Sequence, residues 1–324
     1  MNLTIRRATQ LRTELEKVRR ELEKVIAGKP DVIGKVLTAV IANGHILLDD
    51  VPGVGKTTLA VALAKALDLS CRRIQFTPDV LPSDIVGFSL YDKESGVFLY
   101  RPGIVNGANL LLGDEINRTS SKTQSALLEA MEEKQVTVDG ITYPLEKPFL
   151  VIATQNHVGM AGTQTLPYAQ MDRFTVCLTV GYPDHDAQMD MLRARITSDP
   201  LSQVEKVMSR ETLLSMQREA RQATVKDSIL DYITRLCIAS RAHAWIDVGI
   251  SPRGALHVQR MSQARAFSEG RDYVTAADVQ AVFHDVCVHR VVLSRKARAE
   301  GVTPVQALDA LLKNTANPDR GDKA

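Results

Sequence analysis

Two kinds of apolar pattern alternate along the chain, and each predicts a different kind of element. In residues 9–26, apolar side chains recur every three or four positions, and most positions between them are polar or charged. That period is typical of an amphipathic helix with one buried face. After a short break at residues 28–31, a second helical run covers residues 32–44, and Gly44 is its predicted stop.

Five short, nearly continuous apolar runs follow, separated by helical or turn-rich segments. Such runs fit the strands of a parallel sheet that helices cover on both faces. The runs are residues 45–50, 71–77, 109–115, 148–156 and 174–180.

Polar residues end three of the first four runs: Asp50, the pair Asp114 and Glu115, and Asn156. In open α/β sheets, ligands bind outside the carboxyl ends of the strands. We therefore expect these side chains to belong to a functional site at that edge of the sheet.

Two further segments have the pattern of β-hairpins inserted between the sheet strands. Residues 87–103 alternate around a Lys-Glu-Ser-Gly turn, and residues 135–145 alternate around Asp139-Gly140, a strong hairpin signal. The pattern alone leaves open whether the hairpins decorate the core or engage a partner.

Strand patterns fade after residue 184, and helical periodicity dominates residues 185–314. We therefore predict an α/β domain over residues 1–184, which contains the N-terminal helices and both hairpins, and an all-helical domain over residues 185–314. Residues 315–324 form a polar tail that we expect to be disordered.

Composition narrows the class of protein. The chain has 40 Lys and Arg against 38 Asp and Glu, a net charge of +2, which gives no support for a dedicated nucleic-acid binder. No apolar stretch approaches the roughly 18 residues that span a bilayer, and the charged start does not resemble a signal peptide. The four cysteines lie far apart, as in reduced cytosolic proteins. We therefore expect a cytoplasmic protein that is not integral to a membrane.

The segment after the first apolar run, DDVPGVGKTTLA at residues 49–60, has the pattern of a phosphate-binding loop. Successive backbone amides and a helix N-terminus bind the anion, and glycines remove side chains that would block it. Lys56 would reach the β- and γ-phosphates of ATP, and the Thr57 hydroxyl would bind Mg²⁺. Asp50 replaces the usual first glycine. The predicted nucleotide-binding residues are Pro52, Gly53, Val54, Gly55, Lys56, Thr57 and Thr58.

The run LLLGDEINR places two carboxylates at the end of a predicted buried strand. Asp114 would join the Mg²⁺ shell, and Glu115 would accept a proton from an attacking water. Asn156, at the end of another strand, is placed to hydrogen-bond that water or the γ-phosphate. The alternative is that the Asp-Glu pair caps the following helix.

Two arginines are candidates for contacts to phosphate. Arg173 precedes the fifth apolar run, far along the chain from the phosphate loop. Arg253 follows Ser251 and Pro252, which fit the N-cap and first residue of a helix. A cation in the first turn opposes the helix dipole at a cost of about 0.3–1 kcal/mol, which favours a role for Arg253 with an anion. The alternative for each is a surface or salt-bridged arginine.

Together these motifs resemble the MoxR family of AAA+ ATPases, in the helix-2-insert clade. The resemblance runs from about residue 26 to residue 312 and rests on GHILLDDVPGVGKTTLA, LLLGDEINRTSSKTQSALLEAMEEKQVTVDG, FLVIATQN, GTQTLPYAQMDRF and SPRGALHVQRMSQARAFSEGRDYVTAADV. It implies a nucleotide-binding αβα domain with a five-stranded parallel sheet, a helical lid, and assembly into a ring, typically a hexamer. It also implies ATP and Mg²⁺ as ligands.

By this resemblance, Lys56 and Thr57 belong to Walker A, and Asp114 and Glu115 to Walker B. Asn156 corresponds to sensor 1, Arg173 to the arginine finger offered to a neighbouring subunit, and Arg253 to sensor 2 from the lid. The hairpins correspond to the helix-2 and pre-sensor-1 inserts. Family members commonly lie beside von Willebrand factor A domain proteins, so such a protein is the implied partner.

Four positions depart from the family pattern. His157 and Gly159 replace a proline and an acidic residue after the sensor asparagine, Tyr168 replaces a glutamate, and Gly113 replaces a common alanine. The hydrolytic residues are retained, so the departures bear on coupling between subunits and on partner choice.

The leading hypothesis is an ATPase that remodels a partner protein or inserts metal into it. A small-molecule P-loop kinase shares the loop but needs no Asp-Glu base, and its product would be a phosphorylated acceptor. A DNA motor shares the hairpins, but the balanced charge and 5% aromatic content argue against it. A nucleotide sensor that rarely hydrolyses ATP would not need Glu115.

Overall fold

The computed structural model describes residues 2–156, 166–196 and 199–318, with side chains from residue 10 onward. The strands are β1 (Ile46–Asp49), β2 (Cys71–Gln75), β3 (Gly87–Asp92), β4 (Val97–Pro102), β5 (Leu110–Asp114), β6 (Gln135–Val138), β7 (Ile141–Pro144), β8 (Leu150–Gln155), β9 (Val176–Leu178), β10 (Ile246–Val248) and β11 (Val292–Leu293). The α-helices are α1 (Asn2–Glu23), α2 (Pro30–Ile41), α3 (Lys56–Ala66), α4 (Pro82–Val86), α5 (Ser121–Glu133), α6 (Tyr168–Met171), α7 (His185–Ala194), α8 (Arg210–Ala220), α9 (Asp227–Ala242), α10 (Pro252–Ser268), α11 (Ala276–Cys287), α12 (Arg295–Ala299) and α13 (Pro304–Asn314). Short 3₁₀ turns are η1 (Ile116–Arg118), η2 (Pro200–Gln203) and η3 (Val288–Arg290).

The five predicted apolar runs form one parallel sheet in the order β2-β5-β8-β1-β9, which confirms the α/β prediction. Alternate residues of the buried strands point to opposite faces, and each face has its own core. Ile46 and Leu48 pack with helices α1, α2 and α3, whereas Leu47 packs on the face that contains α4 and α5. Because the central strands are covered on both sides, they read as continuous apolar runs in the sequence.

The N-terminal helical pattern is confirmed, and its apolar stripe is buried against the sheet-covering helices. The buried residues include Leu11, Leu15, Val18 and Leu22 of α1. Helix α2 ends at Ile41, before the predicted stop, because Asn43 adopts the left-handed conformation with φ 54°. Gly44 lies against Thr175, where an added Cβ would be 2.7 Å from the Thr175 Cβ.

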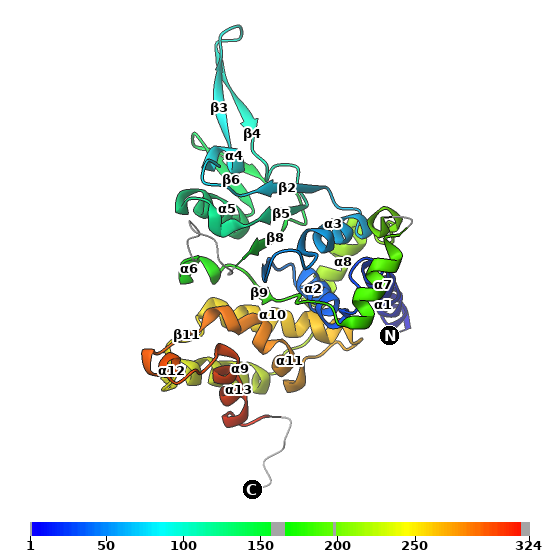
Figure 1. Cartoon of the computed structure of the whole chain (residues 1–324), viewed down its shortest axis with the longest axis vertical. Helices are drawn as coiled ribbons and strands as arrows, with labels where there is room; N and C mark the ends of the chain where they lie inside the picture. Colours follow the sequence, from blue (N-terminus) through cyan, green and yellow to red (C-terminus); the bar gives the residue numbers. More distant parts are fainter. Residues whose placement is uncertain (1, 157–165, 197–198, 319–324) are drawn as a thin grey trace.

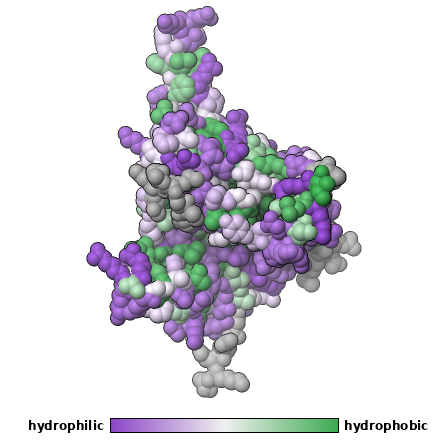
Figure 2. Space-filling model, in the orientation of Figure 1, coloured by the Kyte–Doolittle hydropathy of each residue, from purple (hydrophilic) through white to green (hydrophobic). Residues whose placement is uncertain are grey.

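Both predicted hairpins form, as β3–β4 and β6–β7. The β3–β4 hairpin projects from the body at the opposite end of the molecule from α9 and α13 (Figure 1). It carries exposed apolar side chains, among which Phe98 has 71% of its surface accessible (Figure 2). At the base of the hairpins, the rings of Tyr100 and Tyr143 stack with their centroids 3.9 Å apart.

The chain beyond β9 is mainly helical, as predicted, and also contains the short antiparallel pair β10–β11. Helix α10 packs against α2, and a salt bridge of 2.8 Å joins Lys35 of α2 to Asp285 of α11. One continuous core cluster includes residues from α1 through α13. The predicted division at residues 184 and 185 stays a prediction. No helix in the described part of the chain is both long and apolar enough to cross a membrane.

Candidate nucleotide site and arginine cluster

The phosphate loop connects β1 to α3 at the carboxyl end of the sheet. Gly53 and Gly55 have φ of 85° and 90°, a backbone region in which side chains are strained. An added Cβ on Gly53 would meet nothing within 4 Å, so the space beside the loop is open. Helix α3 begins directly at Lys56, which directs the positive end of its dipole toward that space. The loop therefore fits a phosphate group.

Lys56 is held by three oxygen atoms at this edge. Its Nζ donates to the Asn156 Oδ1 at 2.6 Å, the Asp50 carbonyl at 2.7 Å and the Gln155 carbonyl at 3.2 Å. Burial lowers the pKa of Lys56, whereas nearby carboxylates, Asp50 first among them, raise it. The net pKa is below the ordinary value for lysine. A phosphate would supply negative charge that favours the protonated form.

Asp50 stands where the usual motif has its first glycine, and the structure shows what its side chain does. Oδ1 accepts a hydrogen bond from the Val51 amide at 2.7 Å, and Oδ2 accepts one from the Gly181 amide at 2.6 Å. The backbone φ of Asp50 is not positive, so this position does not need the conformational freedom that a glycine would give. The carboxylate instead joins the start of the loop to the segment after β9.

Glu115 and Asn156 lie together beside Lys56. The Asn156 Nδ2 donates to the Glu115 Oε1 at 2.9 Å, and the Glu115 amide donates to the Thr154 Oγ1, also at 2.9 Å. Glu115 has φ 55°, an uncommon value for a residue with a side chain. Its Oε2 accepts from Gln75 at 2.9 Å and from Arg118 at 2.7 Å. Strain of this kind persists at functional sites where neighbours fix the geometry.

Asp114 ends β5 and is buried. Its Oδ2 accepts from the Arg73 Nε at 2.7 Å, and its Oδ1 accepts from the Thr154 hydroxyl at 3.4 Å. The glycine that precedes it is explained by packing, because a Cβ on Gly113 would lie 2.9 Å from the Phe76 ring. Phe76 therefore fills the space that an alanine methyl group would need.

Within the described residues, no group of three or more His, Cys, Asp or Glu side chains could hold a metal ion. Mg²⁺ is usually bound by one or two protein oxygens together with substrate phosphates rather than by a protein cage. The carboxylate of Asp114 and the hydroxyl of Thr57 are oxygen donors of that kind. These residues fit a Mg²⁺ ion that is bound together with nucleotide.

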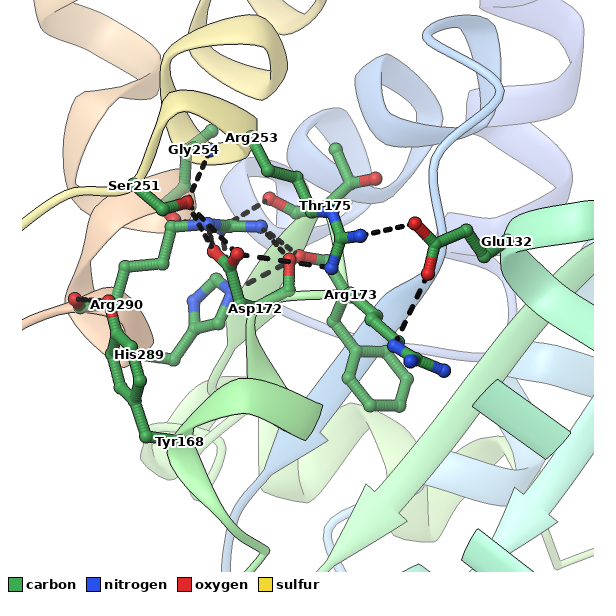
Figure 3. Close-up of polar contacts among 12 residues, drawn as sticks. Glu132, Tyr168, Asp172, Arg173, Thr175, Ser251, Arg253, Gly254, His289 and Arg290 are labelled. Atoms are coloured by element: carbon green, nitrogen blue, oxygen red, sulfur yellow. Dashed lines mark hydrogen bonds and ion pairs between the residues drawn. The ribbon is translucent and has the colours of Figure 1, made fainter. Parts of the chain in front are cut away.

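The two predicted arginines lie elsewhere, at the amino-terminal end of the sheet. Arg173 precedes Thr175, whose amide donates to the carbonyl of His45 just before β1. Arg253 is the second residue of α10. Both arginines reach the same carboxylate: the Arg173 Nε lies 3.3 Å from the Glu132 Oε2, and Arg253 pairs with the Glu132 Oε1 (Figure 3). The structure thus brings the arginines together and separates them from the phosphate loop.

A buried network joins the arginine segment to the start of α10 (Figure 3). Asp172 accepts hydrogen bonds from the Ser251 hydroxyl at 2.9 and 3.0 Å and from the Arg290 Nε at 2.9 Å. Arg290 is fully buried, and its guanidinium also donates to backbone carbonyls of residues 172, 174, 175 and 286. The Tyr168 hydroxyl donates to the carbonyls of Arg290 at 2.7 Å and Gly249 at 3.2 Å. Tyr168 therefore also links α6 to the helical part.

Comparison with known proteins assigns the family. The family model "ATPase family associated with various cellular activities (AAA)" matches residues 45–176, and an AAA lid domain model matches residues 238–311. The chaperone MoxR1 of Mycobacterium tuberculosis is 36% identical over 94% of this chain and 82% of its own. The chain belongs to the MoxR family of AAA+ ATPases.

Two further proteins match this MoxR-family chain over nearly its whole length. The uncharacterized protein YeaC of Bacillus subtilis is 46% identical over 89% of this chain and 90% of its own. A crystal structure of a protein from Cytophaga hutchinsonii assigned as an ATPase has a TM-score of 0.88 and 38% identity over 98% of both chains. The predicted family, the AAA+ fold with its lid and the ATPase activity are thereby confirmed.

Several residues of the MoxR-family site were not found from the sequence. Glu132 lies in an ordinary helical pattern, so nothing marked it as the partner of two arginines. Asp172 is the sequence neighbour of Arg173, and nothing in the pattern predicted a role for its own side chain. Arg290 carried a usable signal, because a lone cation inside the apolar run VCVHRVV predicts a buried charge with several partners. His157 and Gly159, two of the departures from the family pattern, lie outside the described residues.

Proposed function

We propose that this MoxR-type ATPase hydrolyses ATP at the interfaces between copies of itself in a closed ring, and uses the energy to remodel a partner protein. The separation of the site into two parts carries this proposal. Lys56, Glu115 and Asn156 are mutually bonded at the carboxyl end of the sheet, whereas Arg173 and Arg253 face Glu132 at the other end. A neighbouring copy in a head-to-tail ring supplies the missing arginines.

Each residue at the carboxyl end has a defined task in this proposal. The loop amides and Lys56 bind the phosphates, and Glu115 accepts a proton from the attacking water. Asn156 fixes the orientation of Glu115 through their 2.9 Å hydrogen bond. Mg²⁺, when bound through Asp114 and Thr57, would neutralise charge on the phosphates. Arg173 and Arg253 of the neighbour would stabilise negative charge that develops on the γ-phosphate.

The β3–β4 hairpin is the element that we propose engages the partner protein. This projecting element exposes apolar side chains on both of its faces (Figure 2). By the register of the strands, one face carries Phe88, Leu90 and Leu99, and the other carries Tyr91 and Phe98. Exposed apolar patches commonly mark sites of interaction with proteins. The relative MoxR1 is named a chaperone. Chaperones act on other proteins, so this name supports a protein as the partner. A von Willebrand factor A domain protein is the proposed partner, and its maturation or metal loading is the proposed outcome.

Turnover per subunit should rise with protein concentration and then saturate, because each site needs a second copy. The measurement is phosphate release from nanomolar to tens of micromolar protein, with light scattering to follow assembly. Arg173→Ala should stay low at every concentration. Flat turnover from monomers would show that each chain holds a complete site and would overturn the ring.

Glu115→Gln should bind ATP and assemble but release little phosphate. Full activity in this variant would exclude Glu115 as the base. Analysis of the product also separates hydrolysis from the kinase alternative, because a kinase would give a phosphorylated acceptor instead of free phosphate.

A further inference from the structure

A cavity of about 370 Å³ lies between the sheet part and the helical part of the chain. Its walls come from the end of α2, the residue before β1, the end of α5, the segment before β9, the turn after α8, and α10. These elements surround the amino-terminal end of the sheet. The cavity is therefore separate from the phosphate loop, which lies at the carboxyl end.

The walls of this cavity carry an excess of positive charge. Five cationic side chains line it, and Glu132 is the one carboxylate among the lining residues. Both oxygens of Glu132 are already engaged by Arg173 and Arg253. Among the described residues, no carboxylate lies within ion-pair distance of the other three cations. These three are Lys134, Arg221 and Arg260.

The three free cations repel one another in a partly desolvated space. Burial is the main cause that lowers the pKa of Lys134, and the charges of Arg221 and Arg260 lower it further. Burial and Arg221 lower the pKa of Arg260 in the same way. His257 also lines the cavity, and its buried Nδ1 has no hydrogen-bond partner among the described residues. Cations gathered without counter-charges favour a bound anion.

We propose that this cavity is a second anion site, which binds an oligophosphate through Lys134, Arg221 and Arg260. Guanidinium groups bind phosphate oxygens in pairs, and three cations suit a ligand with several negative charges. A cavity of about 370 Å³ falls within the range of small-ligand sites. Two ligands carry phosphates of this kind: a free oligophosphate, and a nucleotide that is bound by a neighbouring copy.

Binding of inorganic tripolyphosphate by calorimetry, without Mg²⁺ or nucleotide, tests the site. The full chain with Lys56→Ala serves as the background, because that change weakens the phosphate loop. We expect one equivalent to bind per chain. The double change Arg221→Gln and Arg260→Gln should weaken binding at least tenfold. Arg218→Gln is the matched control, since Arg218 is an exposed arginine of α8 that does not line the cavity, and its affinity should not change.

Two results would overturn the proposal: no saturable binding to the Lys56→Ala chain, or equal affinity in the doubly changed chain. Arg218, Arg221 and Arg260 are exposed, so loss of folding is not expected when they are replaced. Lys56 is buried, so thermal unfolding curves first check that the Lys56→Ala background is folded. The assay needs no turnover. Tripolyphosphate binding by the Lys56→Ala chain, together with no ATPase activity in the unchanged chain, would refute the proposed function and leave this site standing.

The doubly changed chain with Lys56 intact identifies the source of the phosphate. If the neighbour's nucleotide fills the cavity, the protein concentration that gives half-maximal turnover should rise several-fold, and tripolyphosphate should inhibit assembly. If a free oligophosphate fills it, that concentration should not change. Either result supports the anion site and assigns its ligand.

Discussion

At the residue scale, Glu132 neutralises two arginines that come from segments about 80 residues apart in the chain. Replacement by glutamine removes the charge and keeps the shape. Arg173 then loses its carboxylate partner, and Arg253 keeps only Asp172 at 4.0 Å, so both become more available to phosphate. We expect Glu132→Gln to bind tripolyphosphate several-fold more tightly and to reach half-maximal turnover at a lower protein concentration. Calorimetry and phosphate release measure these changes.

The adjacent Glu133 provides the control, because it is exposed, lies at the end of the same helix and does not line the cavity. Glu133→Gln should behave like the unchanged chain. A loss of turnover in Glu132→Gln would mean that Glu132 holds the arginines in their productive position rather than competing with phosphate.

His45 should make stability depend on pH. Burial lowers its pKa from 6.5 to about 4, and its Nδ1 accepts a hydrogen bond from the Val151 amide that a proton would displace. Between these values the unfolded chain takes up a proton that the folded chain does not, so the free energy of unfolding falls as pH drops from about 6.5 to 4. The full loss is about 3.5 kcal/mol, at about 1.4 kcal/mol for each pKa unit.

Urea unfolding at pH 7, 5.5 and 4 should show a smaller pH-dependent loss for His45→Gln than for the unchanged chain. The loss should not vanish, because burial also lowers the pKa values of His257 and His289. His185→Gln is the control, since His185 is exposed. An identical pH slope in the His45 variant would show that His45 is not the titrating group.

At the element scale, Ser251 has two functions at the start of α10. It caps the helix by accepting from the Gly254 amide at 3.0 Å, and it donates to Asp172 beside Arg173. Loss of a cap costs about 1 kcal/mol of unfolding free energy, and loss of the bond to Asp172 adds a similar amount. Ser251→Ala should therefore lower the free energy of unfolding by about 2 kcal/mol.

Ser209→Ala is the matched comparison, because Ser209 caps α8 by accepting from the Thr212 amide at 3.2 Å and has no link to the arginine segment. It should cost about half as much, and turnover should remain. In Ser251→Ala, turnover should also fall, because α10 positions Arg253. Equal costs and equal turnover in both variants would mean that the bond to Asp172 contributes nothing.

Elements with a strong local pattern were predictable from the sequence. The five strands of the sheet, both hairpins, and the grouping of Lys56, Glu115 and Asn156 followed from apolar runs and from polar residues at their ends. The placement of α10 was not predictable. It depends on contacts such as that between Asp172 and Ser251, the N-cap of α10, which lie 79 residues apart and leave no periodic trace in the sequence.

At the scale of the whole molecule, the division of the site into two parts predicts complementation. A chain with Glu115→Gln keeps its arginines, and a chain with Arg173→Ala keeps its phosphate loop and base. Each should be nearly inactive alone. Mixed in equal amounts, they should recover activity, because about a quarter of the interfaces in a random ring combine the two intact halves.

Phosphate release from the two variants, alone and mixed, measures this recovery. The control is a mixture of Glu115→Gln with Lys56→Ala, because both lesions lie in the same half of the site and no interface becomes complete. No recovery in the first mixture, with assembly confirmed by light scattering, would contradict a site shared between copies.

The link made by Tyr168 limits how far this protein can be recombined with its relatives. Its hydroxyl donates to two backbone carbonyls, those of Gly249 and Arg290, in the helical part of the chain. The glutamate common at this position in the family would direct a carboxylate, which only accepts hydrogen bonds, toward two other acceptors. A chimaera that combines a relative's α6 with this chain's helical part would therefore lose this link and place a carboxylate near two carbonyl oxygens with no donor between them. The two halves of this protein have to be exchanged together.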